Sequence, residues 1–131
     1  MLVNDQAIDP RQAAQYSPLT LAYLGDCVFE LLVREKLVLR GNEPNGRLHF
    51  EAMQYVCAKG QCAFFEKIQP YLTEDEQAVF RRGRNSNAVA GKNQDPAEYK
   101  KATGVETLFG YLYLSGQTRR LEELFELLHI E

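Results

Sequence analysis

Apolar residues recur every three or four positions along most of this 131-residue chain, which is the spacing of one face of an α-helix. No stretch alternates apolar and polar residues with the period of two that marks a half-buried strand. Clusters of Gly, Asn and Pro divide the helical pattern into segments. The predicted helices cover residues 18–40, 47–69, 74–82, 96–115 and 118–128. The pattern therefore predicts an all-α fold.

Capping signals fix several of these boundaries. Ser17-Pro18 is typical of a helix start, because the hydroxyl can accept from free amides and proline needs no donor there. Residues 73–76 (Thr-Glu-Asp-Glu) and 95–98 (Asp-Pro-Ala-Glu) have the form of a capping box. Gly60 is expected to separate two shorter helices, and residues 83–94 form the longest predicted loop.

The composition is typical of one folded domain, expected to span residues 1–131. Hydrophobic residues make up 45% and charged residues 25% of the chain, which excludes extensive disorder. No run approaches the ~18 apolar residues of a membrane span, and the first residues lack a signal-peptide pattern. We therefore expect a cytoplasmic protein that does not enter a membrane.

The cysteines do not suggest a disulfide framework or a zinc site. Cys27, Cys57 and Cys62 are odd in number and have no Cys-x-x-Cys spacing. Free thiols, buried or partly buried, are expected, with Cys27 a small core residue.

Positive charge is concentrated in one segment of an acidic chain. The net charge is -3 and the pI about 5.5, but residues 81–101 alone carry +4 and the remainder -7. The run Arg81-Arg82-Gly83-Arg84-Asn85 suits contacts with phosphate and ribose groups. A solvated loop with ordinary helix-terminal arginines is the alternative.

Two acidic residues lie within apolar helical segments. Asp26 interrupts the run 21–29, although helical spacing also allows it to face solvent at the edge of the apolar stripe. Glu106 has only small or apolar neighbours one turn away and no basic partner. Since an unpaired acid in such surroundings is costly, both acids are candidates for one shared metal ion. Gly25 and Gly110 would let the two helices approach closely enough.

Competing chemistries lack their residues. The two histidines, His49 and His129, show no metal-ligand spacing, and no phosphate-binding glycine loop or nucleophile elbow occurs. The candidate chemistry that remains is a Mg2+ ion held by oxygen ligands and acting on a phosphate-rich substrate.

These motifs in combination resemble a known enzyme family. Residues 21–30 (LAYLGDCVFE) are similar to the signature helix of the ribonuclease III catalytic domain, and residues 102–114 (ATGVETLFGYLYL) to its second acidic helix. Residues 81–85, 91–93 and 110–112 resemble Mini-III, the bacterial and plastid family that consists of the catalytic domain alone. The resemblance covers a core from about 18 to 128.

The resemblance implies an all-helical, homodimeric endonuclease domain that cuts double-stranded RNA, one strand per subunit. Asp26 and Glu106 would be the catalytic and metal-binding residues for Mg2+, and the products would carry 5'-phosphate and 3'-hydroxyl ends. It also implies trimming of the 23S ribosomal RNA precursor, helped by a large-subunit ribosomal protein, and a dimer contact through apolar parts of the Asp26 helix. The residues implied to hold the RNA backbone are Arg81, Arg82, Arg84, Asn85 and Lys92.

The chain departs from full-length ribonuclease III at two acidic positions. Ala22 and Thr103 stand where those enzymes carry further acids, which favours one Mg2+ over two. No double-stranded-RNA-binding domain is expected beside this catalytic domain. A non-catalytic helical module that binds RNA or ribosomes stays open as the alternative function.

Overall fold

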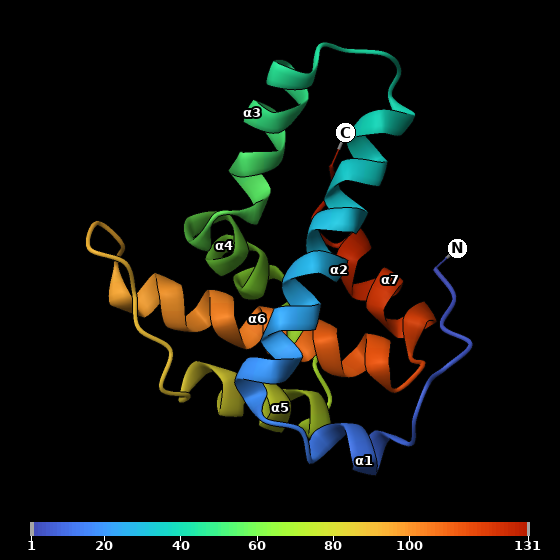
Figure 1. Ribbon diagram of the computed structural model, residues 1–131, viewed down its shortest axis with the longest axis vertical. Helices are drawn as coiled ribbons and strands as arrows, with labels where there is room; N and C mark the ends of the chain where they lie inside the picture. Colours follow the sequence, from blue (N-terminus) through green and yellow to red (C-terminus); the bar gives the residue numbers. More distant parts are fainter. Residues whose placement is uncertain (1, 131) are drawn as a thin grey trace.

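The computed structural model describes residues 2–130, and helices joined by turns make up this part of the chain, with no strand in it (Figure 1). The all-α prediction is confirmed. The elements are α1 (Pro10–Ala14), α2 (Pro18–Leu39), α3 (Asn45–Val56), α4 (Ala58–Ile68), the 3-10 turn η1 (Gln69–Tyr71), α5 (Glu74–Arg84), α6 (Pro96–Leu114) and α7 (Thr118–Glu126).

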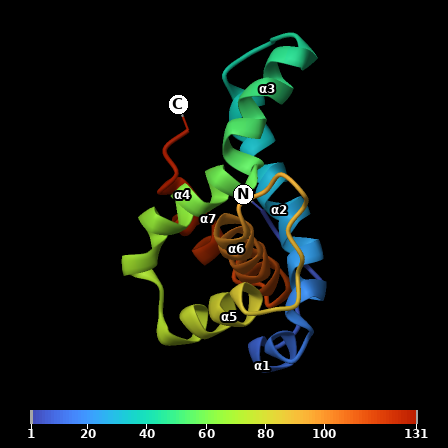
Figure 2. The same cartoon turned by 90° about the vertical axis from the view of Figure 1, so that its left-hand side faces the viewer.

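Helix α6 is the centre of the fold. Its residues are buried on every side from Ala102 to Leu112, apart from the half-buried Glu106. A helix that is apolar all round needs neighbours on every side, and α1, α2, α4, α5 and α7 all pack against it. Figures 1 and 2 show it passing through the middle of the molecule in both views.

An aromatic cluster sets the position of α2 and α4 against α6. Phe29 of α2, Phe64 of α4 and Phe109 of α6 lie with ring centroids 5.5 to 5.7 Å apart, and Phe125 of α7 touches Phe29 at 5.9 Å. Tilted and edge-on pairs of this kind are favourable beyond the area that they bury. Helices α2, α4 and α6 are therefore held together by one packed core.

Helices α2 and α6 cross with backbone against backbone. A Cβ atom on Gly25 would lie 1.7 Å from the carbonyl oxygen of Glu106, and one on Gly110 would lie 1.9 Å from that of Leu21. Only glycine, which has no Cβ, fits at either position. The close approach predicted from these two glycines is confirmed, and it brings the two acidic residues to the crossing.

Several predicted helix ends are confirmed and others shift. Thr73 and Glu76 form the expected reciprocal capping box, although α5 runs two residues past Arg82. Asp95 accepts from the amide of Ala97, and Ser17 occupies its expected N-cap without a side-chain hydrogen bond.

The break between α3 and α4 falls at Cys57, so the prediction of a junction at Gly60 was wrong. Cys57 is extended, with φ -70° and ψ 164°, and its Sγ accepts from the amide of Gly60. Gly60 serves instead to let α4 fold against the end of α3, since a Cβ there would lie 2.3 Å from the carbonyl oxygen of Gln54.

Helix α1 was not predicted. It has only five residues, too few for a periodic signal, but Asp9 and Gln12 form a capping box at its start.

Candidate functional site

Asp26 of α2 and Glu106 of α6 meet at the glycine crossing. Their carboxyl groups lie close enough to interact electrostatically, and Glu106 is the more buried of the two. Burial first, and then repulsion by Asp26 and the hydrogen bond with it, raise the pKa of Glu106 from 4.5 to about 8. The carboxyl group of Glu106 therefore keeps its proton closer to neutral pH than an ordinary glutamate does, and a divalent cation would displace that proton.

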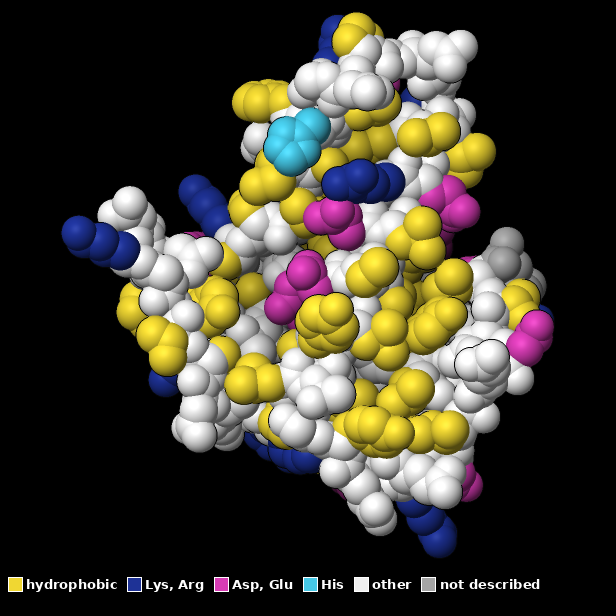
Figure 3. Space-filling model, in the orientation of Figure 1, with side chains coloured by type: hydrophobic (Ala, Val, Ile, Leu, Met, Phe, Trp, Pro, Cys, Tyr) yellow, Lys and Arg dark blue, Asp and Glu magenta, His cyan; other side chains and the backbone are white. Residues whose placement is uncertain are grey.

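Asp26 is exposed, as the solvent-facing interpretation of its spacing allowed. It opens into a hollow of about 450 Å³ with Tyr23, Leu24, Cys27 and Glu30. Figure 3 shows acidic side chains near the middle of this face, beside a broad group of hydrophobic ones. The placement of Cys27 in the core was wrong, because it lies on the side of α2 turned away from α6 and is exposed.

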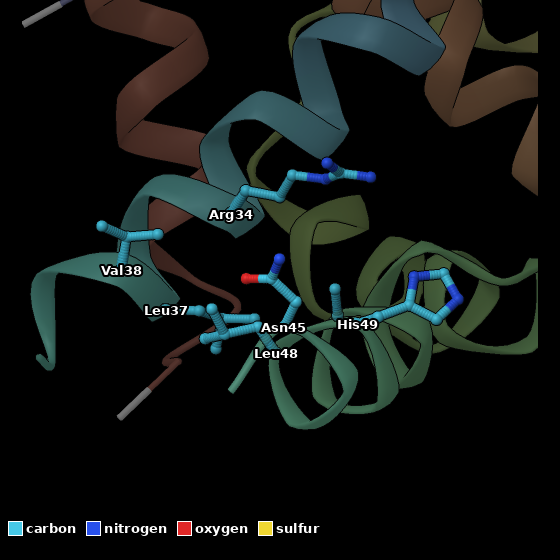
Figure 4. Close-up of a pocket in the computed structure, with 7 residues that line it drawn as sticks. Arg34, Leu37, Val38, Asn45, Leu48 and His49 are labelled. Atoms are coloured by element: carbon cyan, nitrogen blue, oxygen red, sulfur yellow. The ribbon is translucent and has the colours of Figure 1, made fainter. Parts of the chain in front are cut away.

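A second hollow, of about 340 Å³, lies between α2 and α3. Figure 4 shows Leu37 and Leu48 side by side in it, with the His49 ring pointing away from them. No acidic residue lines this hollow, so it offers nothing to a hard cation.

Gln61 of α4 is a site residue that the sequence analysis did not identify. Its side chain is 2% exposed, and its Nε2 donates to Oε2 of Glu106 at 3.5 Å. A signal was present, because Gln61 takes a place in the apolar stripe formed by Phe64, Phe65 and Ile68. One polar residue in such a stripe has a buried partner or a function.

The donor set at the crossing fits Mg2+. Two carboxylates and waters are typical of magnesium sites in proteins, which rarely enclose the ion completely. Among residues 2–130 no group of three or more His, Cys, Asp or Glu side chains could hold a metal. Thr103 donates to the carbonyl of Tyr99 in its own helix, and Glu30 pairs with Arg34 at 2.8 Å, so neither extends the pair.

Four of the five predicted RNA-binding residues lie at or near the loop between α5 and α6, and the fifth, Arg82, is hydrogen-bonded within the fold. Arg81, Arg84 and Asn85 lie at the end of α5, and Lys92 lies in the loop that follows. This loop projects from the body at the first turn of α6 (Figures 1 and 2), about 15 Å along the helix axis from Glu106.

Arg82 has a structural partner. Its guanidinium donates to the carbonyl oxygens of Ala14 and Tyr16, at 2.5 and 3.0 Å. These bonds fasten α5 to the turn between α1 and α2, so the side chain is already engaged within the fold.

Comparison with known proteins gives a consistent picture. The family model described as the ribonuclease III domain matches residues 19–117. A Mini-ribonuclease 3 from Symbiobacterium thermophilum is 52% identical over 110 residues, covering 83% of this chain and 85% of that protein. One from a Thermoanaerobacter species is 39% identical over 127 residues, covering 96% and 89%.

A solved structure shares the fold. The crystal structure of a protein from Fusobacterium nucleatum matches with a TM-score of 0.78 at 28% identity, covering 86% of this chain and 90% of that one. Between residues 2 and 130, no helix has the length and apolar character needed to cross a membrane.

Proposed function

The chain belongs to the ribonuclease III domain family and, within it, to the Mini-ribonuclease 3 proteins, and from this membership we propose that it is a Mg2+-dependent endonuclease of double-stranded RNA. The observation that carries the proposal is the Asp26–Glu106 pair at the glycine crossing. This pair supplies oxygen ligands at the edge of an open hollow, where an RNA backbone can reach it.

In this proposal Asp26 and Glu106 hold one Mg2+ against the scissile phosphate. A bound Mg2+ would lower the pKa of a coordinated water and offset the negative charge that grows on the phosphate. The two carboxylates fix the ion with respect to the rigid α2–α6 crossing, and waters and phosphate oxygens complete the coordination. The products would carry 5'-phosphate and 3'-hydroxyl ends.

We propose that Arg81, Arg84, Asn85 and Lys92 hold the RNA backbone beside this site. A-form RNA presents phosphates and 2'-hydroxyls across a wide, shallow minor groove, which suits a projecting loop with cationic and amide groups. Arg82 is left out of this set, because both terminal nitrogens of its guanidinium already donate to backbone carbonyls within the fold.

Replacing Arg84 by alanine is expected to weaken RNA binding and lower the slope of log affinity against log salt by about one. Fluorescence anisotropy with a double-stranded RNA in EDTA would measure this without cleavage. Arg119 is the matched control, since it is exposed on α7, at the opposite end of α6 from the loop. A salt slope that Arg84→Ala leaves unchanged would make the loop an ordinary solvated segment.

We propose that a second copy of the chain covers the exposed apolar face beside the acids. Four of the five exposed large apolar residues on α2 lie toward one side of the helix, Leu39 at its end being the fifth, and α3 adds two more; those on this face are Leu19, Tyr23, Leu31 and Val38 on α2, and Phe50 and Met53 on α3. A contiguous surface of this kind is unusual on a monomer. Pairing through it would set two acid sites on one duplex, one for each strand.

Tyr23→Asp is expected to convert the protein to a monomer. The Tyr23 side chain is 86% exposed, and burying a carboxylate in its place within an apolar interface is unfavourable. Tyr71→Asp is the control, because Tyr71 is 60% exposed but lies on η1, outside this face. Sedimentation velocity would measure the oligomeric state of both variants. A Tyr23→Asp protein that still sediments as a dimer would contradict the proposed dimer face.

The biological substrate we propose is the precursor of 23S ribosomal RNA, trimmed in the cytoplasm with a large-subunit ribosomal protein as helper. A double-stranded fragment of that precursor should be cut with Mg2+ and left intact with EDTA. Binding of the fragment without cleavage in Mg2+ would instead favour a non-catalytic RNA-binding module.

A further inference from the structure

Gln61 is a buried polar side chain that none of the roles described above uses. It comes from α4, a helix that supplies neither acid, and it reaches the crossing of α2 and α6 from the side. Within the described residues, the only hydrogen bond of its side chain is the one from Nε2 to Oε2 of Glu106.

Packing alone does not account for a glutamine at this position. Phe64, Phe65 and Ile68 continue the same stripe of α4, and leucine or methionine would fill a similar volume there without a polar group to satisfy. What the amide adds is a donor that bears no charge. A carboxylate in its place would bring a third negative group to two that already repel each other.

At 3.5 Å the bond from Nε2 of Gln61 to Oε2 of Glu106 is at the long limit for an N–H···O bond. It places an uncharged donor beside one of the two carboxylate oxygens of Glu106.

We propose that Gln61 is a positioning residue for the metal site, one that holds Oε2 of Glu106 and leaves Oε1 for a divalent cation. This inference rests on the proposed function of the Asp26–Glu106 pair. Gln61 acts through Glu106 and does not itself touch the ion. In a site with only two carboxylates, the orientation of each has a large effect on affinity.

The test measures binding of Mn2+ alone, by electron paramagnetic resonance of the free ion. Gln61→Met keeps the length of the side chain and removes the donor, and Gln61→Leu is a second apolar replacement. Both are expected to raise the dissociation constant for Mn2+ about tenfold or more. The concentration of Mg2+ at half-maximal cleavage should rise in parallel, while KM for RNA stays unchanged.

Phe65→Leu is the control for a general loss of packing. Phe65 lies on the same helix and stacks on Phe80 of α5 with ring centroids 3.9 Å apart, and these two residues line a hollow to which neither acid contributes. It should lower the melting temperature without changing the affinity for Mn2+.

A folded Gln61→Met protein that binds Mn2+ like the wild type overturns the inference. The inference is also overturned if Phe65→Leu lowers the affinity for Mn2+ as much as the Gln61 variants do, because the loss of affinity would then come from packing. Asp26→Asn separates this failure from that of the proposed function. If the wild type does not bind Mn2+, or Asp26→Asn binds it equally well, the metal site itself is wrong and the inference fails with it.

Discussion

Asp26→Asn and Glu106→Gln are each expected to lower the rate of cleavage of double-stranded RNA by about a thousandfold or more, with little change in RNA affinity. Both substitutions keep the size of the side chain and remove one of the two anionic ligands proposed for Mg2+. A site with more acids could retain part of its metal affinity after such a loss. Here the lost charge should appear in kcat, because the metal acts mainly on the transition state.

Glu30→Gln is the control for this prediction. Glu30 lies one turn from Asp26 in the same hollow, but its carboxylate pairs with Arg34 at 2.8 Å. Under single-turnover conditions, the Glu30→Gln protein should cleave a defined RNA duplex at a rate near that of the wild type. If Glu30→Gln were as slow as Asp26→Asn, the hollow as a whole, and not the pair, would be the site.

The same pair predicts a dependence of stability on pH. The pKa of Glu106 is about 8 in the folded protein and near 4.5 when the carboxyl group is free in water. Between these values the folded state binds more protons than the unfolded state, so the stability of the metal-free protein falls as pH rises from about 4.5 to about 8. Melting temperatures in EDTA should show this slope in the wild type and a weaker slope in Glu106→Gln.

Gly25→Ala is expected to destabilise the protein by about 3 kcal/mol or more, which corresponds to roughly 10 °C in melting temperature. The added methyl would lie 1.7 Å from the carbonyl oxygen of Glu106, and backbone cannot rotate aside as a side chain can. The helices must separate to accept it, so the acids also move apart and cleavage should fall. Differential scanning calorimetry and the cleavage assay test the two effects.

Gly46→Ala makes the same change where space is open. Gly46 lies in the first turn of α3, and no atom lies within 4 Å of a Cβ built there. Alanine should leave stability equal or raise it by up to about 1 kcal/mol, because it restricts the unfolded chain. A Gly25→Ala protein that melts with the wild type would mean that the crossing is looser than the structure shows.

The sequence predicts best those features that depend on neighbouring residues. The capping box at Thr73 and the long apolar stripes follow local rules, and they appear where expected. The acid pair could also be predicted, because an acid with apolar neighbours and no basic partner in a helix is a local anomaly. Its meaning required the second acid, some eighty residues later.

Features that depend on distant partners could not be predicted in this way. Arg82 has the composition of an RNA contact, yet its donors go to carbonyls 66 and 68 residues earlier in the chain. Gln61 stands out in its stripe, but only the packing of α4 against α6 shows that it faces Glu106. The break at Cys57 likewise depends on a thiol that replaces the usual oxygen cap.

The backbone contact at the α2–α6 crossing also bears on how this enzyme can be engineered. The closest approach of the two acidic helices is limited where main chain meets main chain, at Gly25 and Gly110, and the aromatic cluster of Phe29, Phe64 and Phe109 holds α2 and α6 at that contact. Core residues that belong neither to this contact nor to the aromatic cluster can therefore be exchanged for heat resistance while the distance between the two carboxyl groups is kept. A thermostable variant made in this way should keep the cation preference proposed for its parent.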